Sequence, residues 1–272
     1  VGEGKSTAMS IDRWRWQLRQ AIAELPLSDV GKGLVAALTI GDGSLLPQSV
    51  WDRFARSGII HLLVISGLHI GLAGMLGYLF GFFLGCCLGL LRAGTNALHW
   101  ACICSLITAC SYAVLSGFGL PAQRALVMLM VVYSVLLLGR YIPRGGGYTI
   151  ALLAVAVWDP LAVLSAGFWL SFGAVALLLW LIPQERSSAA KLKQFATLQW
   201  LMFVGLLGLL MFWQLPTSPL SPLINLLAIP WVSFGVVPLC LAGILFYPFS
   251  TGLAEVLWQL AGWQLDKLAT LI

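Results

Sequence analysis

The sequence has little charge. Only 9% of its 272 residues are Asp, Glu, Lys or Arg, whereas 60% are hydrophobic, and the mean hydropathy is +0.95. Soluble globular domains carry roughly 25% charged residues, because charged side chains cover the surface that faces water. The scarcity of charge therefore excludes an ordinary soluble domain and predicts a chain that lies mainly within a lipid bilayer.

Several other features are also missing. The six cysteines lie in apolar runs without the spacing of a zinc site. We therefore expect no metal, no other cofactor and no disulfide framework. We expect no cleavable signal peptide, since the first long apolar run begins near Leu62. The opening Gly4-Lys5-Ser6 is similar to the end of a phosphate-binding loop, but no strand precedes it, and we interpret it as a linker in a fragment of a longer protein.

Beyond His61, long apolar runs follow one another, each about 20 residues long, which is the length that crosses a bilayer core. These runs are 62–84, 97–116, 121–139, 147–163, 166–183, 195–213 and 222–247. A more amphipathic helix is expected near 252–270. The run 147–163 is the weakest, so it either crosses alone or pairs with 166–183 as a re-entrant hairpin. The sequence predicts an all-α polytopic membrane protein with about seven spans plus amphipathic interfacial helices.

The first part of the chain differs from the rest, and we divide the chain into a semi-polar region, 1–60, and a multispan region, 61–272. Apolar side chains recur at helical spacing near the start, at Ile11, Trp14, Leu18, Ala21, Ile22 and Leu25. This pattern predicts an amphipathic helix that lies on a membrane surface or docks on a partner domain. Further helices are expected after Ser28 and over 48–57, with Gly58 at the end of the latter.

Charges in the loops predict the orientation. The loops after the first, third and fifth runs are basic, at Arg92, Arg140, Arg144, Arg186, Lys191 and Lys193. The loops after the second, fourth and sixth runs carry almost no basic residue. Basic loops face the cytoplasm in membrane proteins, so the N-terminal region is predicted to lie outside.

Glycines recur along the first run at spacings of three and four, at Gly67, Gly71, Gly74, Gly77, Gly81, Gly85 and Gly89. These positions share one helical face. We favour a groove of small residues into which another helix packs closely, and the alternative is the wall of a narrow conduit.

Polar side chains occur at corresponding places in four of the runs. His69, Arg124, Ser171 and Asn225 each lie in the N-terminal part of an odd-numbered run. Odd-numbered spans share a direction, so all four are predicted to lie in the same, outer half of the bilayer. The N-terminal ends of helices favour anions, so this arrangement predicts an anion-accepting mouth.

Each of these positions also has a structural interpretation. His69 is either functional or a neutral histidine bonded to a neighbouring helix. Arg124 faces a polar cavity beside Gln123, or its side chain extends to the lipid headgroups. Trp169 is a candidate for base stacking, and Ser66 is a neighbour of His69 on the same helix.

Several short blocks resemble the ComEC-type competence family. Residues 61–69 read HLLVISGLH, which closely resembles the signature of that family. Further blocks are similar to the family's and follow in the same order: ALTIGD at 37–42, GLPAQR at 119–124, Asp159-Pro160, GFWLSF at 167–172 and NLLAIP at 225–230. The resemblance covers nearly the whole chain from about residue 10.

The resemblance implies a channel that passes single-stranded DNA across the bacterial cytoplasmic membrane during natural transformation. It also implies partners beyond the lipid bilayer, namely the OB-fold and metallo-β-lactamase-like nuclease domains of full-length members. The sequence lacks the zinc motif of that nuclease, so we do not expect an enzyme. Two alternatives remain: a secondary transporter of a small anionic solute, and an intramembrane enzyme that uses His69 with Ser66 or Asp159. The sequence does not indicate whether one or two copies form the channel.

Overall fold

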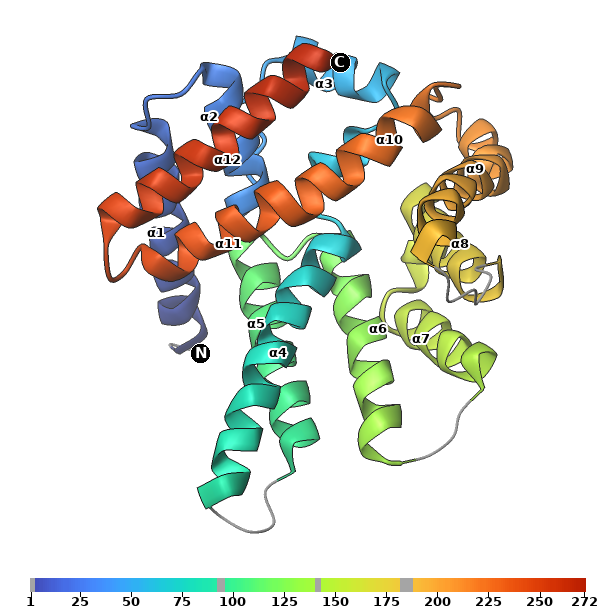
Figure 1. The fold of residues 1–272 in the computed structure, drawn as a ribbon, viewed down its shortest axis with the longest axis horizontal. Helices are drawn as coiled ribbons and strands as arrows, with labels where there is room; N and C mark the ends of the chain where they lie inside the picture. The colour runs from blue at the N-terminus through green and yellow to red at the C-terminus, as the bar shows by residue number, and fades with distance from the viewer. Residues whose placement is uncertain (1–2, 92–95, 140–142, 182–187) are drawn as a thin grey trace.

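The computed structural model describes residues 3–91, 96–139, 143–181 and 188–272, and its regular elements there are helices (Figure 1). The N-terminal elements are α1 (Glu3–Ala23), α2 (Asp29–Ile40), α3 (Gln48–Arg56) and the 3-10 helix η1 (Ile60–Leu62). The central elements are α4 (Gly67–Leu91), α5 (Ala97–Leu115), α6 (Leu120–Leu137), α7 (Arg144–Trp158), the 3-10 helix η2 (Pro160–Leu164), α8 (Ala166–Leu181) and α9 (Ser188–Phe212). The chain ends with α10 (Ser221–Pro230), the π-helix η3 (Trp231–Val236), α11 (Val237–Phe246) and α12 (Thr251–Leu271).

The helices confirm the predicted fold class. Five segments of the described chain are long and apolar enough to cross a membrane, namely Ile60–Leu90, Ala97–Leu115, Leu120–Leu137, Gln194–Phe212 and Ser221–Phe246. Two shorter apolar helices, Gly145–Trp158 and Ala166–Trp180, correspond to the fourth and fifth predicted runs. The chain is therefore a multi-pass helical membrane protein by length and composition. The basic residues Arg92, Arg140 and Arg186, on which the predicted orientation depends, lie outside the described residues.

Local sequence explains where several of these helices begin and end. Pro121 stands in the first turn of α6 after Gly119, where a proline costs no helical hydrogen bond. Asn96 and Ser250 cap α5 and α12 by accepting backbone N–H groups. After α3, Gly58 adopts φ +74°, which glycine reaches without strain, and turns the chain toward η1.

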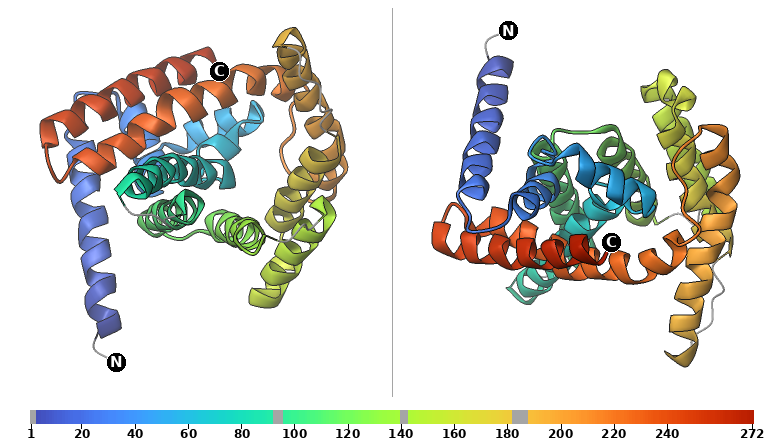
Figure 2. Two further views of the ribbon diagram at one scale, coloured as in Figure 1. Left: turned by 60° about the horizontal axis from the view of Figure 1, so that its bottom comes forward. Right: turned by 90° about the horizontal axis from the view of Figure 1, so that it is seen from above.

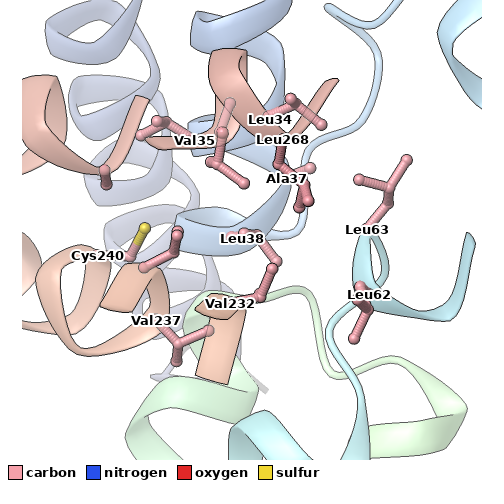
Figure 3. Close-up of a cluster of buried hydrophobic side chains, with 14 of the residues drawn as sticks. Leu34, Val35, Ala37, Leu38, Leu62, Leu63, Val232, Val237, Cys240 and Leu268 are labelled. Carbon is pink, nitrogen blue, oxygen red and sulfur yellow. The ribbon is translucent and has the colours of Figure 1, made fainter. Parts of the chain in front are cut away.

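The N-terminal region packs against the C-terminal helices. Its apolar stripe is fully buried at Leu18 and Ile22, and the same hydrophobic core contains Val237 of α11 and Trp258 of α12. Figure 3 shows part of this core, with side chains of α2, η1, η3, α11 and α12 directed toward one another. The amphipathic α1 thus uses its apolar face within the chain.

A second unit consists of α4, α5 and α6, which extend away from the first core (Figure 1). α4 packs closely along α5, and both contact α6. Four glycines of α4 have α5 atoms within contact distance of an added Cβ, namely Gly74, Gly77, Gly81 and Gly85. Gly67 lies against Ala125 of α6, whereas Gly71 has no atom within 4 Å of an added Cβ.

The last apolar segment runs in an unexpected direction. α10, η3 and α11 form one continuous rod that crosses α4 near its N-terminal end at an angle (Figures 1 and 2). Contacts of η3 and α11 with α4 mark this crossing. The rod is thus inclined to α4, and the prediction that the odd-numbered runs enter the membrane from the same side stays a prediction. Hydropathy specifies the length of a span, and packing against neighbouring helices sets its direction.

The close α4–α5 contact predicts different effects for two glycines of one helix. In Gly81→Ala, the methyl group meets the carbonyl oxygen of Trp100 and lies 2.9 Å from the Cα atom of Ala101. We expect this substitution to lower the free energy of unfolding by about 1–3 kcal/mol. Gly71→Ala is the matched control, since open space surrounds it and alanine favours the helix. Thermal unfolding in detergent measures both, and equal melting temperatures for the two variants would contradict the packing shown by the structure.

Candidate functional site

Three of the sequence blocks converge on one pocket above the start of α4. Its walls come from the end of α2 with the following loop, from residues 63–65 before α4, and from the loop that leads into α6. The lining residues are Ala37, Gly41, Gly43, Trp51, Leu63, Val64, Ile65, Ser116, Gly119, Pro121 and Ala122, and the volume is about 170 Å³. This is smaller than the roughly 300 Å³ of the smallest typical ligand pockets, so the pocket alone does not define a binding site.

Arginines of α1 hold these loops in place. The Nε of Arg19 lies 3.2 Å from a carboxylate oxygen of Asp42, and its guanidinium also donates to the Ser44 hydroxyl at 3.0 Å. The guanidinium of Arg15 donates to the carbonyl of Ile40 at 3.3 Å and lies beside Gly117. The amphipathic helix therefore fixes the block at 37–42 through ionic as well as apolar contacts.

His69 is completely buried in the first turn of α4. Its Nδ1 accepts the backbone N–H of Ser66 at 3.3 Å, while its buried Nε2 has no hydrogen-bond partner among the described residues. One ring nitrogen is thus used to orient the imidazole, and the other remains available to a ligand or water.

Arg124 lies on α6, with only 7% of its surface exposed. Its guanidinium faces Gly167 in the first turn of α8, and its buried Nε has no partner in the described part of the chain. The neighbouring Gln123 does not share this environment, since its amide donates to the carbonyl of Phe118 at 2.8 Å and closes the preceding loop.

The two candidates on α8 have separate surroundings. The indole N–H of Trp169 donates to the carbonyl of Val163 at 2.7 Å, and the residue remains 40% exposed. Its ring packs edge-on against that of Phe168 at 5.5 Å. Ser171 is half-buried and follows two residues later, on a different face of the helix.

Asn225 links α10 to the loop after α3. Its amide donates to the Ser221 hydroxyl at 3.1 Å, and that hydroxyl donates to the carbonyl of Gly58 at 3.3 Å. The buried Oδ1 of Asn225 has no partner among the residues that the structure covers. Sequence reasoning missed both Ser221 and Gly58 as parts of this contact, because no local pattern joins positions so far apart.

Three of the predicted polar residues lie on different helices but have a similar environment. No hydrogen bond or ion pair joins His69, Arg124 and Asn225 in the described chain, and each has a buried polar atom without a partner. Further atoms of this kind occur at Arg15 Nε, Thr39 Oγ1 and Ser233 Oγ. Thr39 lies in the block at 37–42. Ser233 lies in the π-helix η3, and no sequence pattern predicted that π-helix.

Metal binding gains no support from the arrangement. A group of three or more His, Cys, Asp or Glu side chains that could hold an ion does not occur within the described ranges. Asp159, weighed above as a partner of His69, instead accepts the N–H groups of Leu161 and Ala162 at 3.1 and 3.2 Å and so begins η2.

Comparison with known proteins decides the family. The family model described as "Competence protein" matches residues 38–272. The chain belongs to the competence protein family. Competence protein ComA of Neisseria gonorrhoeae is 36% identical over 275 residues, which cover 97% of this chain and 38% of that protein.

Other members are similar over most of this chain. Recombination protein 2 of Haemophilus influenzae is 32% identical over 89% of the chain, and ComE operon protein 3 of Bacillus subtilis is 26% identical over 84%. The chain spans only 28% to 38% of the length of these relatives. No solved structure matches.

The contact between Arg19 and Asp42 predicts a dependence of stability on pH. Burial of the Asp42 carboxyl raises its pKa, but hydrogen bonds from Ser44 and the charges of Arg19 and Arg15 lower it by more, so that the pKa lies below the ordinary 3.8. A carboxylate whose pKa falls on folding stabilises the fold above its unfolded pKa, and this contribution is lost as the pH falls through the folded value.

We therefore expect wild type to unfold at a higher temperature than Asp42→Asn near pH 7, and the difference to shrink below about pH 4. Melting temperatures in detergent across this range provide the measurement. A difference that stays constant down to about pH 3 would contradict the assigned role of Asp42.

Proposed function

We propose that this chain forms the membrane-channel part of a DNA-uptake protein and passes single-stranded DNA across the bacterial cytoplasmic membrane. Membership of the competence family and the apolar segments support this proposal. The N-terminal region would lie outside, with the mouth in the outer half of the bilayer. DNA-binding and nuclease domains would belong to the part of the relatives that this chain does not cover.

One structural observation carries the proposal of a polar mouth. His69 and Arg124 both lie near the N-terminal ends of their helices, α4 and α6, and both have a buried nitrogen without a partner in the described chain. A buried polar group without a hydrogen bond destabilises a fold by about 1–3 kcal/mol. Such groups persist where water or a ligand satisfies them, and a translocated strand offers a phosphate with every nucleotide.

The broken last span favours a second candidate. Pro230 ends α10, and a π-helical segment follows before α11, as in transporters whose interrupted helices bind small solutes. A secondary transporter of a small anion would use the same unpartnered groups. It does not account for the family blocks, and we therefore place it second.

Transport by purified protein in liposomes separates these two candidates. We expect a labelled single-stranded oligonucleotide to cross protein-containing vesicles faster than protein-free vesicles, because the path replaces water around each phosphate. Small anions such as phosphate and lactate are measured in parallel. Flux of a small anion with no flux of the oligonucleotide would reject the DNA channel and favour the transporter.

His69 is expected to matter for transport and not for insertion into the membrane. His69→Ala removes the unpartnered Nε2, and we expect the rate of oligonucleotide transport to fall about tenfold, as loss of one hydrogen bond implies. His99→Ala is the matched control, since His99 is exposed on α5. Normal transport by His69→Ala at normal protein levels would make His69 a structural residue.

A further inference from the structure

The contact between α6 and α8 brings two positive groups together. The guanidinium of Arg124 faces Gly167, with Nη2 and Nη1 at 3.2 and 3.3 Å from a Cβ built on that glycine. Gly167 is the second residue of α8, a helix of 16 residues. The first turn of a helix presents N–H groups and the positive end of the helix dipole. In α8, Ser165 accepts the N–H of Phe168 at 3.2 Å, which leaves the N–H groups of Ala166 and Gly167. A cation at this position is repelled by the positive end of the helix unless an anion binds beside both groups.

No acidic side chain in the described part of the chain compensates this pair of positive groups. No ion pair or hydrogen bond of Arg124 is found within the described residues, although only 7% of its surface is exposed and its Nε is fully buried. The carboxylate of Asp159, between α7 and η2, instead accepts backbone N–H groups of η2. Below Arg124, α6 packs on an apolar cluster that contains Phe168 and Phe172 of α8.

Such an arrangement is unfavourable without a ligand. Burial of an unpaired charge costs more than burial of a neutral polar group, and native proteins pair such charges. Extension to the lipid headgroups does not explain Arg124, because the packed helices cover its side chain. A tetrahedral oxyanion accepts hydrogen bonds from a guanidinium and from helix N-terminal amides at the same time, and it neutralises both.

We infer that Arg124 and the backbone amides of Ala166 and Gly167, at the start of α8, form a binding site for one phosphate-type oxyanion. The inference rests on the proposed function for its ligand, which is then one phosphodiester of the translocated strand. The guanidinium and the amides donate hydrogen bonds to phosphate oxygens and contact no base, so the site would bind DNA independently of its sequence. Gly167 is a positioning residue, since a methyl group there would push the guanidinium away from the amides.

The site is tested with four proteins in detergent or nanodiscs: wild type, Arg124→Gln, Gly167→Ala and Gly208→Ala. Gly208→Ala is the matched control, because nothing lies within 4 Å of a Cβ at this helical glycine of α9. The first measurement is the rise in melting temperature that inorganic phosphate produces. The second is the affinity for an oligonucleotide with a phosphodiester backbone and for the same sequence with an uncharged methylphosphonate backbone.

We expect phosphate to stabilise wild type and Gly208→Ala, and not Arg124→Gln. The affinity for the phosphodiester strand should fall on the order of tenfold to a hundredfold in Arg124→Gln, as loss of a charge-assisted hydrogen bond implies. Gly167→Ala should show a smaller loss. The methylphosphonate strand should bind all four proteins alike.

Equal phosphate stabilisation of wild type and Arg124→Gln would overturn the site, whatever the protein transports. Arg124-dependent phosphate binding combined with an unchanged affinity for the phosphodiester strand would overturn DNA as the ligand. A free phosphate or a lipid headgroup would then be the source, and added anionic lipid distinguishes the two by stabilising wild type more than Arg124→Gln. The channel proposal is tested separately by transport: if the oligonucleotide does not cross liposomes that contain wild-type protein, the channel proposal is wrong.

Discussion

A polar group inside an apolar fold destabilises it unless a partner accepts or donates a hydrogen bond, and this constraint organises the whole chain. The hydroxyl of Tyr112 donates to the carbonyl of Leu38 at 2.6 Å and so joins α5 to α2. The hydroxyls of Ser105 and Tyr133 lie 2.5 Å apart and join α5 to α6. Because such pairing is usual within the fold, the few buried atoms without a partner are the positions at which a ligand or a bound water would find a hydrogen-bond partner.

The positions of these buried polar atoms follow from the packing of the hydrophobic helices. The core shared by α1, α2, α11 and α12 holds the segment before α4, and the Arg19–Asp42 pair fixes the adjoining loop. The Ser221 hydroxyl, bonded to Gly58, ties α10 to the same segment. The N-terminal ends of α4 and α6 therefore start from a rigid base, which is what a site built on first-turn side chains and amides requires.

The apolar segments of the fold were predictable from the sequence, but the contacts between residues of different segments were not. Hydropathy gave every apolar segment, because crossing a bilayer imposes a length that the sequence displays directly. Loop charge did not indicate the inclination of the last segment, since the rod from Ser221 to Phe246 packs across α4. His69, Arg124 and Asn225 could be selected from the sequence, because polar side chains within apolar runs are unfavourable unless they have a function or a partner. No sequence pattern indicates that Arg124 contacts Gly167. Contacts between distant segments depend on side-chain packing, which periodicity within one helix does not encode.

If the chain conducts DNA as proposed, its path has to bind each phosphate and then release it, which would explain why cations are few along it. The arginines of α1 show the other solution: Arg19 is paired with Asp42, and Arg15 with Ile40 and, more weakly, Asp12. A carboxylate beside Arg124 would stabilise the fold in the same way but would occupy the donors that a phosphate needs. The buried Arg124 Nε without a partner lowers the stability of the protein without a ligand, and an anion bound at the proposed site would restore that stability.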